Sequence, residues 1–455
     1  MIFCESCLEK QRKIDRLEDE IVSLKNKLKY DKKKTRDGYF GSSTPSSKKP
    51  MKENTSSCNR NKNGGAKRGH KGYGRKSISE RDADKIEYLA VDDTCPVCGG
   101  ELIDKGTVDR SIIDSVPVKA ERILCRCEKK WCPRCRKTIT GKPSVLPKSL
   151  YGNRLISQAA AMHYGHGVPV GRVETILGEN LISGSLFDVF HRLAKLWKPA
   201  IPRIIEEYRK EAVKHADETS WRINGYSGYA WLFCTKRTII FQFRDTRSSR
   251  VPHSVFGEQK LPGVLVVDRY AGYNRIPCKI QYCFCHLLRK VEDTGKQFID
   301  DPEVQTFVGE FAPLLAEAIH LRATDITDMM YYKKARALKR KILKIIDSPS
   351  RHLGIKEIQI IFKENKGRLY HWVKDRDVPA DNNRAERELR PTVIARKVSF
   401  GSQSEKGAQT RSILMTILHT AQKRLKDQTL EDWFKNTLDQ LAFNPNLDPY
   451  SLLPP

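Results

Sequence analysis

The hydrophobic positions at the start of the chain follow a helical period. In residues 1–34, apolar side chains recur at alternating steps of three and four, which is the seam of a short coiled coil. They are Ile14, Leu17, Ile21, Leu24 and Leu28. A single amphipathic helix packed on its own protein would show the same pattern. We therefore expect a helix here, with self-association as its functional interpretation.

Helical spacing returns between residues 148 and 199. Apolar residues recur on one face over 154–163, over 170–177 and again after Ser183, and Gly178 ends the second of these helices. Two short helices joined by a turn that contains Gly resemble a helix-turn-helix, although small bundles without DNA contacts look alike. The pattern predicts a helical, DNA-binding region.

After these helices the pattern changes to that of β-strands. Branched and aromatic residues predict strands at 212–223, 229–235 and 238–243. Residues 263–268 form a short apolar run that ends in a carboxylate, which is typical of a buried strand. We expect Asp268 to lie where this strand leaves the sheet, at the edge where sites are usually built.

The last part of the chain is predicted to be mostly helical. Helical spacing over about 293–375 indicates an all-helical insertion, and another amphipathic helix lies in the tail, 401–455. Between them, Asp381 would cap a short helix, because Asp accepts hydrogen bonds from free backbone N–H groups. Pro391 would stop that helix after Arg390.

Composition adds a large positive charge to this picture. The 455 residues carry a formal net charge of +28, which points to a polyanion, above all nucleic acid. A membrane surface is the rival, but no apolar run approaches the roughly 20 residues of a spanning helix. The N-terminus lacks a secretory core. We expect a cytoplasmic protein.

Residues 35–90 are rich in Gly, Ser, Lys and Arg, which predicts a flexible linker. Its clustered cations, Lys67 and Arg68 among them, suit a DNA backbone. A linker that only keeps the protein soluble would have the same composition.

The chain has thirteen cysteines, and this odd number favours metal sites or buried thiols over a disulfide framework. Two Cys-x-x-Cys pairs within 91–147 predict a closed, structural zinc site, with a hairpin whose strands lie near 116–118 and 122–125. The expected ligands are Cys95, Cys98, Cys132 and Cys135. A thiol cluster without metal is the alternative. The roles of Cys4, Cys7, Cys125 and Cys127 stay open, and Cys125 or Cys127 could replace a ligand.

Three carboxylates, Asp217, Asp268 and Glu386, fall at the predicted ends and faces of these elements. Phosphoryl transfer on DNA uses two divalent ions held by oxygen ligands from distant segments. Each acid also has an ordinary explanation, such as a surface ion pair between Glu386 and Arg390 or a polar strand end at Asp217. Their joint occurrence in so basic a chain favours a metal site. Arginines on the same short helix suit bidentate phosphate contacts. They are Arg384, Arg387 and Arg390.

Several strings of residues resemble bacterial DDE transposases of the insertion-sequence-sixty-six family. They are the linker Gly64-Gly-x-x-x-Gly-His-Lys-Gly, the Cys pairs, His215-Ala-Asp-Glu-Thr219, Asp268-x-Tyr-x-x-Tyr273, Cys285-His286-Leu-x-Arg289, Asp381-Asn-Asn-x-Ala-Glu-Arg387, Arg390-Pro391 and Arg396-Lys397. The string from Asp381 is the most specific of them.

The resemblance implies a ribonuclease-H-like catalytic domain at 200–400, with the helical insertion before the glutamate. It implies that Asp217, Asp268 and Glu386 hold two Mg²⁺ ions, with Mn²⁺ as a substitute. Asp381 could compete with Glu386 as a ligand, but we interpret it as the helix cap. Further DNA contacts are expected from a basic loop at Arg396 and Lys397 and from His286, although a core histidine is the alternative there.

The sequence therefore predicts a multidomain α+β transposase. It would bind the ends of its insertion sequence, cleave strands, and join the 3′-hydroxyl to target DNA. We expect it to form a homo-oligomer, and the resemblance suggests small accessory proteins of the same element. The alternatives are a zinc and helix-turn-helix DNA-binding protein without activity, and a metal-dependent nuclease that does not join strands.

Overall fold

The structure is a computed structural model that describes residues 151–178 and 183–455 continuously, with parts of 10–25 and 120–149 and residue 81. The chain divides into two compact units, one of residues 51–119 and one of 1–50 and 120–455. The linker residues Lys67 and Arg68 lie outside the described residues, as do Cys95, Cys98 and Cys135. The zinc site therefore stays a prediction.

The described residues between Lys10 and Lys25 are helical, as the heptad spacing predicts. The apolar side chains of the seam that are described are about half exposed: Ile14, Leu17, Ile21 and Leu24. Coiled-coil pairing through this face stays a prediction.

A small antiparallel hairpin accompanies the second cysteine pair. It consists of β1 (Lys129–Cys132) and β2 (Lys137–Thr140), with Lys129 opposite Thr140. The strand predicted near 122–125 was wrong, because the described residues Ile123 and Cys125 belong to no strand.

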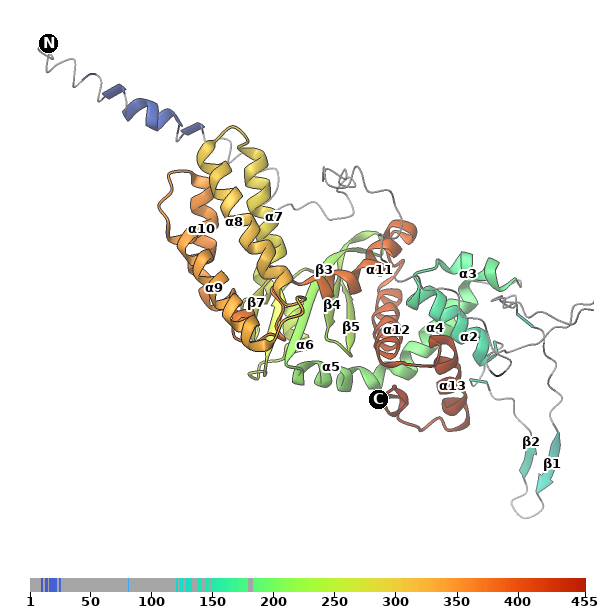
Figure 1. The fold of residues 1–455 in the computed structure, drawn as a ribbon. Helices are drawn as coiled ribbons and strands as arrows, with labels where there is room; N and C mark the ends of the chain where they lie inside the picture. The colour runs from blue at the N-terminus through green and yellow to red at the C-terminus, as the bar shows by residue number, and fades with distance from the viewer. Residues whose placement is uncertain are drawn as a thin grey trace, which may run out of the picture. The chain divides into compact units, whose positions relative to one another are not determined.

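A mixed sheet of five strands forms the centre of the larger unit (Figure 1). Its strands are β3 (Val213–Ile223), β4 (Tyr226–Cys234), β5 (Ile239–Arg244), β6 (Val264–Val267) and β7 (Lys279–Tyr282). They lie in the order β5-β4-β3-β6-β7. The first three are antiparallel, and β6 and β7 run parallel to β3. This arrangement is consistent with a ribonuclease-H-like domain.

The turn between β3 and β4 consists of Asn224 and Gly225, with Ile223 paired to Tyr226. Both turn residues have positive φ, 51° and 78°, as a two-residue hairpin of the primed type requires. With this tight turn, β4 begins at Tyr226, before the start at residue 229 that the apolar residues predicted.

Helix α12 (Glu405–Arg424) covers the free edge of the sheet at β5. Three backbone N–H groups of the strand donate to hydroxyls of the helix: Ile239 to Thr420 (3.1 Å), Phe241 to Thr416 (3.0 Å) and Phe243 to Ser412 (3.0 Å). Without these acceptors the edge would present unpaired N–H groups, which favour aggregation.

The helices before and after the sheet share its core. They include α2 (Asn153–Ala160), which continues as a π-helical turn to Gly165, α3 (Val170–Leu177), α4 (Ser183–Trp197), α5 (Ile201–Lys210), α6 (Arg250–Phe256) and α13 (Leu430–Phe443). Helix α4 packs on α12 and α13 packs on α2. One hydrophobic cluster joins these helices to the sheet. Domain boundaries at 199 and 400 stay a prediction, but elements on both sides of each share one core.

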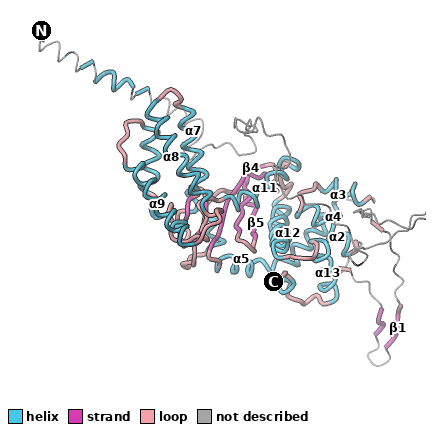
Figure 2. The backbone as a smooth tube through the Cα atoms, in the orientation of Figure 1, coloured by secondary structure: helices cyan, strands magenta, loops and turns pink. Residues whose placement is uncertain are grey.

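The segment between β7 and the last helices is helical, as predicted. It contains α7 (Phe284–Gln297), α8 (Pro302–Leu321), α9 (Asp328–Asp347) and α10 (Leu353–Glu364), which pack together beside the sheet (Figures 1 and 2). Among the described residues, no helix is long and apolar enough to cross a membrane.

Helix α11 (Asn383–Ser399) corrects the sequence analysis. Pro391 was predicted to end the helix, but it lies inside it, at a cost of about 3 kcal/mol or more in a helix interior. The helix packs on β3 and β4 with one buried face, so tertiary packing offsets that cost. That face consists of Ala385, Leu389, Thr392 and Ala395. Arg396 and Lys397 consequently lie in its last turn rather than in a loop.

Candidate active site

The three predicted carboxylates lie on elements that the sheet brings together. His215 of β3 pairs with Val266 of β6 in a parallel register, so Asp217 and Asp268 follow at equivalent positions of neighbouring strands. Glu386 lies in the first turn of α11, which packs on β3. Positions distant in the sequence thus converge beside the end of β6, an inner strand of the sheet.

The electrostatics of Asp217 show that its acidic neighbours are close. Burial raises the pKa of the Asp217 carboxyl well above its usual range, and the charges of Glu218, Asp268 and Glu386 raise it further. Oxygen Oε1 of Glu386 is buried and has no hydrogen-bond partner among the described residues. Converging carboxylates, one of them with an unpaired buried oxygen, form a donor set that fits Mg²⁺.

Asn382 holds the start of α11 against β3. Its side-chain amide donates to the Ala216 carbonyl (2.8 Å), and its Oδ1 lies 3.0 Å from Nδ1 of His215. Burial lowers the pKa of His215 to about 4. The imidazole is therefore neutral at pH 7, and it donates from Nδ1 to Asn382. The backbone N–H of Glu386 donates in turn to the Asn382 carbonyl (3.2 Å), which fixes the carboxylate-bearing turn.

A second set of contacts brings together the two ends of the helical insertion. The N–H of Phe284 donates to the carbonyl of Ala380 (2.8 Å). The N–H of Asn382 donates to the sulfur of Cys283 (3.1 Å). The chain therefore leaves the sheet and returns to it at adjoining points beside the carboxylates.

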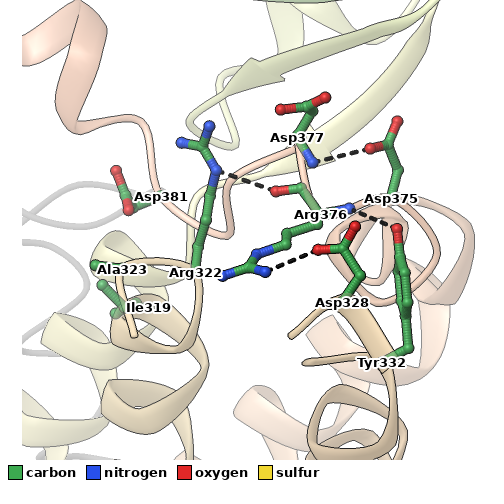
Figure 3. Close-up of a pocket in the computed structure, with 9 residues that line it drawn as sticks. All are labelled: Ile319, Arg322, Ala323, Asp328, Tyr332, Asp375, Arg376, Asp377 and Asp381. Carbon is green, nitrogen blue, oxygen red and sulfur yellow. Dashed lines mark hydrogen bonds and ion pairs between the residues drawn. The ribbon is translucent and has the colours of Figure 1, made fainter. Parts of the chain in front are cut away.

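Asp381 was predicted to be the helix cap, but it lies one residue before the N-cap of α11. Its Oδ1 accepts a hydrogen bond from the N–H of Asn383 (2.8 Å), although Asn382 occupies the N-cap position itself. Asp381 also lines a cavity of about 440 Å³ between α8, α9 and the loop before α11 (Figure 3). Asp217, Asp268 and Glu386 do not line this cavity, which therefore adjoins the site rather than containing it.

Glu218 is a residue beside the carboxylates that the sequence analysis did not single out. Its side chain is 2% exposed and accepts hydrogen bonds from Arg247 (2.6 Å) and from the Tyr273 hydroxyl (2.7 Å). Burial and the charge of Asp268 raise its pKa to about 7, against the opposing effect of Arg247 and Tyr273. The motif Asp268-x-Tyr-x-x-Tyr273 already contained one of these partners.

Some of the predicted DNA-binding residues are exposed, whereas Arg396 is engaged in contacts within the protein. Arg387, Arg390 and Lys397 are exposed on α11, and no ion pair joins Arg390 to Glu386 in the described part of the chain. Arg396 instead donates to Oγ1 of Thr219 (3.1 Å) and to the Ser220 carbonyl (2.6 Å), so it ties α11 to β3.

His286 lies in the first turn of α7, close to Glu386. Burial lowers its pKa, but a hydrogen bond to Cys283 and the charges of Cys283, Asp268 and Glu386 outweigh that effect and raise it above the usual value. His286 therefore belongs to the surroundings of the carboxylates.

Comparison with known proteins relates more than half of this chain to one transposase family. A family model described as "Transposase IS66 family" matches residues 148–410. "Uncharacterized protein y4qI" of Sinorhizobium fredii is 23% identical over 405 residues, which cover 79% of this chain and 73% of the relative. "Uncharacterized protein y4hP" of the same organism is 22% identical over 408 residues, with the same coverage of both chains.

Proposed function

The chain belongs to the IS66 family of transposases, and we propose that it binds the ends of its insertion sequence, cleaves strands there, and joins the freed 3′-hydroxyl to target DNA. The observation that supports this mechanism most directly is the parallel register that puts Asp217 beside Asp268, with Glu386 on the helix packed over them. DNA is the partner that a transposase requires, and a net charge of +28 suits it.

In this proposal Asp217, Asp268 and Glu386 are the ligands for two Mg²⁺ ions, or Mn²⁺ in their place. When bound, such ions activate the attacking oxygen and stabilise the leaving oxygen of a phosphoryl transfer. Asn382 positions Glu386 by anchoring the start of α11 on β3. Arg384, Arg387 and Arg390 on the same helix would hold the scissile backbone.

The remaining parts of the proposal concern DNA binding and assembly. A structural zinc held by Cys95, Cys98, Cys132 and Cys135 would stabilise a module of the DNA-binding half. Helices α3 and α4 and the linker would contact the element's terminal repeats. The N-terminal helix would pair protomers, and small proteins of the same element would assist.

The proposal is tested with Mg²⁺-dependent cleavage and joining on DNA that carries the element's own ends. Asp268→Asn is expected to bind this DNA like wild type but to cleave about 10³-fold more slowly or worse, because charge stabilisation worth several kcal/mol is lost. The exposed Asp427→Asn is the matched control and should cleave normally.

Other outcomes separate the alternatives. Unimpaired cleavage by Asp268→Asn would show that the site is assigned wrongly. Cut ends without joined product would favour a nuclease. Binding without cleavage by wild type, even with the element's accessory proteins added, would favour the DNA-binding protein without activity.

A further inference from the structure

Cys283, His286 and Glu386 face one another where helices α7 and α11 begin. Cys283 is the N-cap residue of α7, His286 lies in its first turn, and Glu386 lies in the first turn of α11. One ligand atom from each of the three side chains lies within 4.8 Å of the other two. The hydrogen bond from the Asn382 N–H to the Cys283 sulfur holds the starts of α7 and α11 at this separation.

Two polar atoms of this cluster have no partner. Nδ1 of His286 and Oε1 of Glu386 are both buried and make no hydrogen bond within the described residues. Buried polar atoms are nearly always paired, so unpaired atoms on two of the three adjoining side chains indicate that this cluster has room in its bonding for a ligand.

The chemistry of the three groups selects the ligand. A thiolate and an imidazole are ligands for zinc and similar transition metals, whereas Mg²⁺ prefers oxygen ligands. The Cys283 sulfur already accepts the Asn382 N–H at 3.1 Å, an outer contact of the kind that orients and stabilises a metal ligand. On binding, the thiol proton passes to solvent.

We propose that Cys283, His286 and Glu386 bind a thiophilic divalent ion such as Zn²⁺ or Co²⁺ at a site that shares Glu386 with the carboxylates Asp217 and Asp268. This site is distinct from the zinc site predicted at the Cys-x-x-Cys pairs. Because one carboxylate serves both sites, an ion held by the thiol and the imidazole competes for Glu386. The competition for Glu386 rests on the proposed function, whereas ion binding by Cys283, His286 and Glu386 does not.

The test is Co²⁺ and Zn²⁺ binding by the full chain, measured as bound metal per chain and as the Co²⁺–thiolate absorption band. Wild type is expected to bind one ion more than Cys283→Ser or His286→Gln, whose affinity at this site should fall at least about 100-fold. Cys278→Ser is the matched control, because this partly buried thiol lies against Pro262 and Gly263, away from the cluster. It should keep the wild-type stoichiometry.

The Cys-x-x-Cys pairs are the same in wild type and variants, so metal bound there cancels when the bound metal per chain is compared. His286→Gln keeps the thiol and Cys283→Ser keeps the imidazole, so the site can be tested even if one variant does not fold. Equal metal content and equal spectra in wild type and a folded variant would overturn the proposal. The measurement needs no DNA, so a failure of the transposase mechanism would not be mistaken for a failure of this site.

Competition for Glu386 has its own measurement. Zn²⁺ added to the Mg²⁺-dependent cleavage reaction is expected to slow wild type and Cys278→Ser alike. If Zn²⁺ occupies the site in the binding experiment but leaves the cleavage rate unchanged, Glu386 is not shared.

Discussion

At the scale of single residues, buried histidines join the first helices to α12. His163 in the π-helical turn accepts a hydrogen bond at Nε2 from Arg411 (2.9 Å), and its Nδ1 donates to the Val168 carbonyl (2.7 Å). His419 of α12 donates from Nε2 to the carbonyl of Tyr164 (3.1 Å). Burial lowers the pKa of His163 to about 3 and that of His419 to about 4. Both are therefore neutral in the folded protein at neutral pH.

Replacing His419 with Gln is expected to weaken the pH dependence of stability. A folded pKa below the unfolded value means that the unfolded chain binds more protons, so stability is lost as pH falls from about 7 towards 4. Between pH 7 and pH 5, His419 alone should cost wild type about 2 kcal/mol of unfolding free energy. Urea unfolding at both pH values measures it.

His419→Gln keeps a donor for the Tyr164 carbonyl but cannot titrate, so its loss between pH 7 and pH 5 should be smaller by that amount. The exposed His320→Gln should follow wild type. Identical pH dependence in wild type and His419→Gln would show that this imidazole is not held neutral.

At the scale of elements, the contact between α12 and β5 depends on a match of two periods. Two residues of a strand rise about 6.6 Å and four residues of a helix about 6 Å. Ser412, Thr416 and Thr420, spaced by four, therefore meet alternate N–H groups of β5. The hydroxyls of α12 accept hydrogen bonds from the edge strand, as the carbonyls of a further strand would.

Thr416→Val is expected to destabilise the protein by about 1–3 kcal/mol, because it leaves the buried N–H of Phe241 without an acceptor. Thr416→Ser keeps the hydroxyl and should cost less. Denaturant unfolding gives the energies, and faster hydrogen exchange at Phe241 should accompany the loss in Thr416→Val only. A valine variant as stable as wild type would mean that the hydroxyl contact contributes little.

Elements with a strong local pattern could be predicted, and features made by tertiary contact could not. The apolar run that ends at Asp268 and the helix that Gly178 ends are where the sequence puts them. Helix α11 continues past Pro391 because its buried face packs on the sheet, which no local rule contains. The burial of Glu218 depends on strand register. The approach of His286 to Glu386 depends on the contact between Cys283 and Asn382. Neither produces a periodic pattern in the sequence.

At the scale of the whole molecule, the net charge of +28 is expected to govern the affinity for DNA. Binding to DNA should release counterions, so affinity for the element's ends is expected to fall about 10³-fold or more between 50 and 200 mM salt. Arg387→Gln and Arg390→Gln, both at exposed positions of α11, should each reduce the slope of log affinity against log salt by about 1.

The control for this experiment is Lys333→Gln, at an exposed position of α9 in the helical insertion. If that basic face is only solvated, the slope stays at the wild-type value. A slope that is insensitive to Arg387 and Arg390 but sensitive to Lys333 would move the DNA path from α11 to the insertion.

The hydrogen bond between Phe284 and Ala380, which joins the two ends of the helical insertion, has a consequence for the length of that insertion. Because both ends of the helical insertion are fixed at one place, the insertion is in effect a long closed loop. Lengthening a flexible loop costs little, about 0.6 kcal/mol for each doubling of its length. We therefore expect that helices can be added to or removed from this insertion without moving Asp268 or Glu386. The number of residues between Asp268 and Glu386 is then set by the length of the insertion and not by the distance between the two carboxylates.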